Sequence, residues 1–76
     1  MRRVGDVVRT AGGLAVLRVP EDEEPSDIGT MVVDDSLSTV GRVVDVFGPV
    51  AHPYVAVTPT GPVELADLLG ATLYAR

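Results

Sequence analysis

The sequence lacks cysteine and has few aromatic residues, and these absences limit how the fold can be stabilised. With no cysteine among the 76 residues, neither a disulfide nor a thiolate metal site is available. The single histidine, His52, cannot build a zinc site alone. Aromatic residues make up only 4% of the chain, so 15 valines and seven leucines must supply the core. We expect no metal and no cofactor, which leaves a partner protein as the additional source of stability.

Lysine is also absent, and the charge balance argues against direct binding of nucleic acid. Six arginines face eleven acidic residues, which gives a formal net charge of −5. Proteins that bind nucleic acid do so mostly by neutralising phosphates with Lys and Arg. Two explanations of the acidic surface remain, an ordinary domain or one from a salt-loving cell. We favour the second.

The length and hydropathy predict one domain that spans residues 1–76. Hydrophobic residues make up 46% of the chain, unlike in disordered proteins. No apolar run approaches the roughly 20 residues that span a bilayer, and the N-terminus lacks the apolar stretch of a signal peptide. We therefore expect a cytoplasmic protein that makes no membrane contact. We identify no internal repeat and no linker.

Short β-type runs separated by turn residues predict an all-β fold. The expected strands are residues 4–9, 14–19, 30–35, 39–47, 54–58 and 71–75. Gly12-Gly13 joins the first two as a hairpin, because glycine adopts positive φ without strain. Residues 64–69 are expected to form a single helical turn that ends at Gly70. Since an open sheet this small would leave long exposed edges, we expect a closed barrel of about six strands.

Residues 39–47 form the longest predicted strand, and strict alternation gives it two largely apolar faces. One face carries Val40, Val44 and Val46 together with Arg42. The other face carries Val43 and Phe47 together with Gly41 and Asp45. This pattern predicts a central strand, and a glycine inside it predicts a bend or a close approach of another backbone.

The acidic residues are more readily explained by structure than by catalysis. Asp34 and Asp35 lie at a predicted turn, where aspartate commonly bonds its own backbone. The acidic segment 20–27 is either a solvated loop, which we favour, or a contact for a basic partner. Asp45 lies on an apolar strand, where it would either cap the following turn or face a partner.

No set of residues predicts an enzyme. His52 is the only histidine, and no serine elbow or glycine-rich phosphate loop accompanies it. Pro53 restricts it to an extended backbone, which is consistent with an ordinary loop histidine. A hydrolase that uses Asp45 and His52 is the enzymatic alternative, and we do not favour it. We assign no catalytic residue.

The segment from Gly48 to Tyr54 is the strongest candidate for a binding surface. Pro49 and Pro53 fix its backbone, so little entropy is lost on binding. Phe47, Val50, Pro53 and Tyr54 together would offer an apolar and partly aromatic surface in an acidic protein. Such patches commonly mark protein interfaces. The alternative is that Phe47 and Tyr54 fill the thin core, and we expect that one of the two does.

These residues also carry a resemblance to a known family. The string 40–50 (Val-Gly-Arg-Val-Val-Asp-Val-Phe-Gly-Pro-Val), followed by Pro53-Tyr54-Val55, resembles the core domain of the Gar-one family, the subunit with glycine-arginine-rich tails in H/ACA ribonucleoproteins. The similarity extends from about Val4 to Tyr74. The chain differs from eukaryotic members in lacking arginine-glycine-rich tails, which points to the minimal archaeal form.

The resemblance implies a six-stranded barrel like the second domain of translation elongation factors, the reductase/isomerase/elongation-factor type. It implies direct binding to the catalytic domain of a dyskerin-type pseudouridine synthase. Guide RNA and the other ribonucleoprotein subunits would be indirect partners. The expected role is non-catalytic: the subunit influences a mobile substrate-gripping loop and turnover during pseudouridylation of ribosomal RNA in ribosome biogenesis.

The expected contact with the synthase combines this resemblance with the apolar segment. Its residues are Asp45, Phe47, Gly48, Pro49, Val50, Pro53 and Tyr54. One alternative is a Naf-like assembly factor, although such proteins carry long flanking segments. Another is an independent RNA-binding barrel in ribosome maturation, which the negative charge and the scarcity of aromatic residues disfavour.

Overall fold

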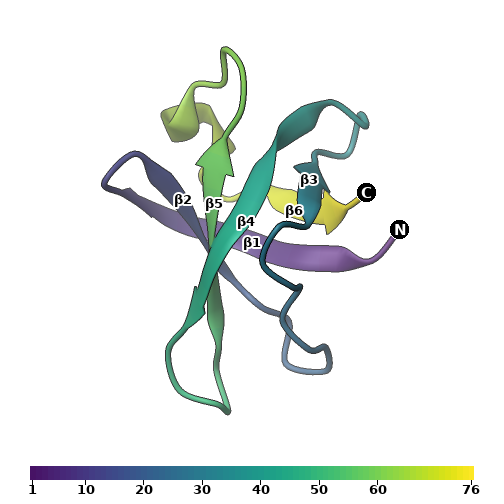
Figure 1. Ribbon diagram of the computed structural model, residues 1–76, viewed down its shortest axis with the longest axis vertical. Coiled ribbons are helices and arrows are strands. Elements are labelled where there is room, and N and C mark those ends of the chain that lie inside the picture. Colours follow the sequence, from purple (N-terminus) through teal and green to yellow (C-terminus); the bar gives the residue numbers. More distant parts are fainter.

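The chain forms a closed antiparallel β-barrel of six strands (Figure 1). The computed structural model describes residues 1–76. Its elements are β1 (Arg3–Ala11), β2 (Leu14–Arg18), β3 (Met31–Val33), β4 (Thr39–Phe47), β5 (Tyr54–Pro59), the 3-10 helix η1 (Leu65–Leu68) and β6 (Thr72–Ala75). The strands close in the order β1-β2-β5-β4-β3-β6. The predicted all-β class and closed barrel are confirmed. No helix in the structure is long and apolar enough to cross a membrane.

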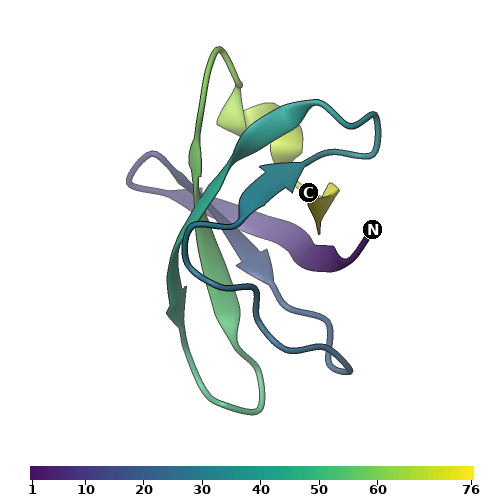
Figure 2. The same ribbon diagram turned by 45° about the vertical axis from the view of Figure 1, so that its right-hand side comes forward.

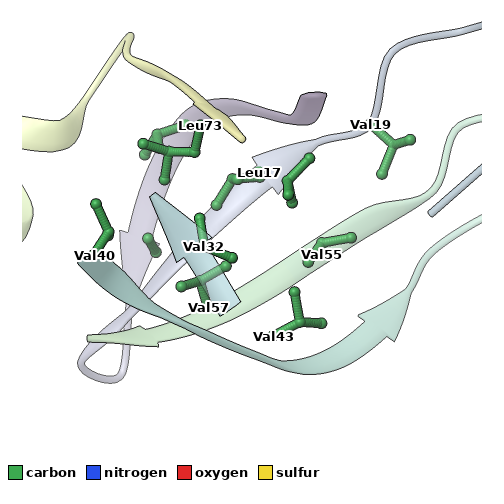
Figure 3. Close-up of a cluster of buried hydrophobic side chains, with 11 residues drawn as sticks. Leu17, Val19, Val32, Val40, Val43, Val55, Val57 and Leu73 are labelled. Atoms are coloured by element: carbon green, nitrogen blue, oxygen red, sulfur yellow. The ribbon is translucent and has the colours of Figure 1, made fainter. Parts of the chain in front are cut away.

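The barrel interior is filled by aliphatic side chains alone (Figure 3). The core cluster consists of Val4, Val7, Ala15, Leu17, Val19, Val32, Val40, Val43, Val55, Val57 and Leu73. Burying one such valine or leucine stabilises the fold by about 1.5–3 kcal/mol. The expectation of an aliphatic core is therefore correct, and no aromatic ring belongs to it.

Two predicted glycine effects are present in the backbone. Gly12 and Gly13, with φ of 57° and 78°, form the two-residue connection between β1 and β2, which is the geometry that favours glycine. In β4, a Cβ on Gly41 would overlap the carbonyl oxygen of Thr58 in β5. The close backbone approach predicted at Gly41 is therefore confirmed.

The predicted faces of β4 are wrong because two register shifts interrupt its alternation. One shift lies between the β3 residues Val32 and Val33, whose partners are Gly41 and Thr39, so Val40 is skipped in the pairing. The other lies between Val43 and Asp45 and skips Val44. As a result Val40 and Gly41 are both buried, whereas Val44 is 38% exposed. Bulges of this kind let a strand bend around a small barrel.

The expectation that the chain has no internal repeat is also wrong. Residues 4–8 (Val-Gly-Asp-Val-Val) and 40–44 (Val-Gly-Arg-Val-Val) occupy equivalent positions in β1 and β4. The pairing of β1 with β2 and with β6 contains one register shift each, as does the pairing of β4 with β5 and with β3. A Cβ on Gly5 would overlap the carbonyl oxygen of Arg18, as one on Gly41 would overlap that of Thr58.

Hydrogen bonds outside the regular strand pairing repeat in the same way. The N–H of Val43 donates to the oxygen of Thr30 at 3.0 Å, and the Val43 oxygen accepts from Gly29 at 2.8 Å. Val7 makes the equivalent two bonds to residues 70–71, both at 2.9 Å. Exchanging β1–β3 with β4–β6 leaves the closed strand order unchanged. The barrel therefore consists of two similar three-stranded halves related by an approximate two-fold axis.

The loops at opposite ends of the barrel differ between the halves. In both ribbon views η1 lies at one end, and the β4–β5 loop points to the other, toward which the loop after β2 also extends (Figures 1 and 2). Leu65 and Leu68 of η1 are partly buried and pack against the core. The predicted helical turn is confirmed as a 3-10 helix, and Gly70 follows it with φ of 82°.

Candidate docking site

The β4–β5 hairpin presents a rigid apolar tip to solvent. Its base is formed by the rings of Phe47 and Tyr54, which stack with centroids 5.9 Å apart and planes 20° apart. Gly48 has φ of 91°, and a Cβ there would lie only 3.0 Å from the Tyr54 ring. At the tip Val50 is 99% exposed. A fully exposed valine on a loop that begins and ends at stacked rings is a suitable anchor for a partner.

The hairpin brings together all the residues that the sequence predicts for the synthase contact. Asp45, Gly48, Pro49 and Val50 are exposed, and Phe47, Pro53 and Tyr54 are partly exposed. Neither Phe47 nor Tyr54 belongs to the core cluster, so the alternative in which one of them fills the core is wrong. The Asp45 carboxylate accepts no hydrogen bond from a backbone N–H or from another side chain; the carboxylates that do are those of Asp34 and Asp6. Asp45 therefore does not cap the following turn, and its exposed side chain faces outward.

The two-fold repeat separates Val50 from the other exposed apolar side chains. Seven large hydrophobic residues are exposed, and six of them form equivalent pairs. The pairs are Met1 with Leu37, Val8 with Val44, and Ile28 with Leu69. Since both halves share these positions, they belong to the pattern of the barrel. Val50 alone has no counterpart.

Val50 lacks a counterpart because the two equivalent hairpins have different loops. The β1–β2 hairpin closes through Gly12-Gly13 alone, whereas residues 48–53 separate β4 from β5. Closing this barrel therefore does not require the longer loop. Apolar residues that the fold does not need are better explained by a binding role.

A groove runs between the β4–β5 loop and the acidic loop that follows β2. It has a volume of about 410 Å³ and is lined by most residues of 20–25 and 46–53. The N–H of Val19 donates to the oxygen of Pro53 at 3.3 Å and links the two walls. Four of the lining residues are prolines, so both walls have restricted backbones.

The rim of this groove is negatively charged. Glu21, Glu23 and Glu24 line it, and no arginine does. Arg3 lies 3.6 Å from Glu23 Oε1, while Glu23 Oε2 is buried without a hydrogen-bond partner. Arg2 donates to the backbone oxygen of Glu24 at 2.6 Å and holds the acidic loop against the N-terminal strand. Four of the five acidic side chains of this loop are exposed, which agrees with the solvated loop that the sequence favours, and a contact with a basic partner stays a prediction.

The other titratable residues noted in the sequence lie outside this groove. Oδ1 of Asp34 accepts hydrogen bonds from the hydroxyl and N–H of Ser36 and from the N–H of Ser38, at 2.8, 2.9 and 3.0 Å. The Ser36 hydroxyl, followed by the Ser38 N–H, holds the pKa of Asp34 below its ordinary value. The predicted turn function of Asp34 is therefore confirmed. His52 is exposed on the β4–β5 loop, and no three His, Asp or Glu side chains form a metal-binding group.

Fold and site together define the chain as a small closed β-barrel with an exposed apolar hairpin beside an acidic loop. No family model matches the chain. It is 27% identical over 59 residues to an uncharacterized protein of the archaeon Methanothermobacter thermautotrophicus, an alignment that covers 74% of this chain. The same alignment spans 64% of the archaeal protein's length.

Proposed function

We propose that this barrel is a non-catalytic cytoplasmic subunit of an H/ACA ribonucleoprotein. In this role the β4–β5 hairpin docks on the catalytic domain of a dyskerin-type pseudouridine synthase. The subunit then favours one state of the substrate-gripping loop and so influences turnover. Such coupling requires only a difference in affinity for two states of the partner, typically about 1–3 kcal/mol.

The observation that carries the proposal is the isolated exposure of Val50. At 99% exposed, its side chain gains nothing from the fold of the monomer. Its burial in an interface would remove apolar surface from water at about 25 cal/mol per Å². The resemblance of residues 40–55 to the Gar-one family identifies which partner to test first.

The charge distribution supports protein docking over independent RNA binding. The loop beside the hairpin contributes three glutamates to the groove and no cation, which would repel phosphates. The one stacked ring pair, Phe47 with Tyr54, already uses one face of each ring, which reduces the ring surface left for stacking on bases. A gel shift with guide RNA alone tests this alternative, since tight binding without the synthase would favour it.

The docking face is tested by replacing Val50 with aspartate. We expect Val50→Asp to weaken the complex with a dyskerin-type synthase by at least about tenfold, equivalent to about 1.4 kcal/mol, because a carboxylate would enter an apolar contact. Affinity is measured by calorimetry or biolayer interferometry, and multiple-turnover pseudouridylation is measured in parallel. Tyr54→Ala should weaken the complex in the same direction.

Leu69→Asp is the matched control for this experiment. Leu69 is also exposed, at 54%, but it follows η1 at the other end of the barrel (Figure 1). Both variants should melt like the wild type. Equal affinities for the two variants would place the interface on another face, and no binding by the wild-type chain would refute the proposed partner.

A further inference from the structure

The second half of the barrel covers its end with residues of its own chain. The loop between β5 and β6 carries η1, which lies against β1 and β2. Leu65 and Leu68 of this helix are partly buried and pack against the core. The equivalent loop of the first half joins β2 to β3, and both loops end in a glycine of positive φ, Gly29 or Gly70.

Acidic residues replace these leucines in the first half. Counted back from the two glycines, Glu24 corresponds to Leu65 and Asp27 corresponds to Leu68. Both acids are exposed. The loop after β2 therefore provides no apolar side chain equivalent to those that η1 inserts.

The hairpins beside these two loops show the opposite difference: the larger apolar side chains are in the first case absent from the hairpin and in the second case present. Thr10 and Ala11, near the end of β1, are both exposed beside a loop that brings its own leucines. Their equivalents in β4 are Val46 and Phe47, which are partly buried and line the groove. The larger apolar side chains thus occur at the end of the barrel where the adjoining loop supplies Val19 to the core and two prolines to the groove, but no leucine.

The negative charges that line the groove indicate which kind of partner would bind there. Glu21 and Glu24 line the groove, and neither carboxylate takes part in an ion pair or a hydrogen bond. Glu23 has only the 3.6 Å contact with Arg3. A nucleic acid, or a second copy of a chain with a net charge of −5, would add repulsion at this rim. A segment with basic side chains would relieve it.

Resting on the docking role proposed above, we infer that this groove receives one helical turn of the partner protein. The turn inserts a leucine-like side chain beside Val46 and Phe47, in the position that η1 occupies in the other half. An arginine or lysine on the same turn pairs with Glu21 and Glu24. Because prolines restrict both walls of the groove, little additional ordering is needed on binding.

The first experiment uses the isolated chain, and so does not depend on the identity of the partner. A synthetic amphipathic peptide of Leu, Arg and Ala is titrated into isotope-labelled protein, alongside a peptide with Glu in place of each Arg. We expect amide shifts at Val46, Phe47 and Val50 with the Arg peptide and none with the Glu peptide. Shifts scattered over the surface acids, or equal shifts with both peptides, would overturn the inference.

A pair of double variants tests the groove within the complex. The rim variant, Glu21→Lys with Glu24→Lys, reverses the charge at two of the three glutamates of the groove. The control, Glu64→Lys with Asp67→Lys, makes the same charge change on the η1 loop. All four acids are exposed, so both variants should fold, as checked by circular dichroism. We expect the rim variant to lose the Arg-peptide shifts and at least tenfold in affinity for the synthase, while the control retains both.

The outcomes distinguish the inference from the proposed function. If the peptide binds in the groove but the wild-type chain does not bind the synthase, the groove inference holds and the proposed partner is wrong. If the synthase binds the rim variant and the control equally well, the docking role stands and the groove inference fails. A dimer of the isolated chain in sedimentation, held through the groove, would also overturn it.

Discussion

At the scale of single residues, polar side chains shape the turns, and the exposed valine distinguishes the site. Asp34 lies at the end of β3 and bonds residues of the following turn, where Leu37 has a φ of 68°. A non-glycine residue in this region requires support from its surroundings. The hydrogen bonds to Oδ1 of Asp34 provide that support.

Replacing Ser36 with alanine should raise the pKa of Asp34 toward its ordinary value. The variant removes the hydroxyl that contributes most to the lowered pKa. A lowered pKa in the folded state stabilises the protein above the unfolded-state pKa, and this contribution is lost as pH falls through the folded-state value. Ser36→Ala should therefore destabilise the protein near neutral pH, with a difference that shrinks in acid.

Carboxyl NMR titration together with urea unfolding at several pH values checks this prediction. Ser38→Ala is the control, because the bond from Ser38 to Asp34 comes from its backbone N–H. An unchanged Asp34 titration in Ser36→Ala would assign the lowered pKa to the backbone donors.

At the scale of strands, the sequence locates the elements but not all of their bounds or faces, since the strand expected over residues 30–35 covers only Met31–Val33. The 39–47 strand and the Gly12-Gly13 hairpin match the structure because strand propensity and turn chemistry are local. The faces of β4 depend on register shifts that are set by pairing with β3 and β5. A period of two cannot predict a bulge, so simple alternation wrongly places Val44 on the same face as Val40.

Gly41→Ala should destabilise the barrel by about 1–3 kcal/mol or more, the usual cost of overpacking. The added methyl group would overlap the Thr58 oxygen, which belongs to the backbone and cannot rotate away. Urea unfolding measures the loss, which is large beside the roughly 4–11 kcal/mol expected for a domain of this size.

Gly12→Asn is the control for this substitution. A Cβ on Gly12 would meet nothing within 4 Å, and its φ is 57°. Asn-Gly is moreover a preferred pair for such turns, so the variant should leave stability nearly unchanged. If Gly41→Ala were equally well tolerated, β4 would not approach β5 as closely as the structure indicates.

At the scale of the whole molecule, the two-fold repeat joins the fold to the candidate site. The repeat is hard to detect in the sequence because only residues 4–8 and 40–44 are closely alike, while core valines and leucines replace one another elsewhere. The hairpin site was predictable because its prolines, rings and valine are contiguous. The groove was not, since its acidic wall lies beside the hairpin only because β2 pairs with β5, which is distant in the sequence.

The uneven charge of the molecule predicts that salt stabilises it. Eleven acidic residues face six arginines, and both ion pairs involve the same residue, Arg3. Most carboxylates therefore repel one another without local compensation, and salt screens this repulsion as the Debye length falls from about 10 Å at 0.1 M to about 3 Å at 1 M. We expect the melting temperature to rise steadily with potassium chloride over this range.

The double variant Glu64→Gln with Asp67→Asn separates screening from the general effect of salt on apolar burial. Both residues are exposed and neither forms an ion pair, so the variant lowers the magnitude of the net charge by two while leaving the core intact. Screening predicts a higher melting temperature at low salt and a smaller rise with potassium chloride. Equal slopes for the variant and the wild type would mean that salt acts through apolar burial. A melting temperature independent of salt would refute the expectation that the protein is adapted to high salt.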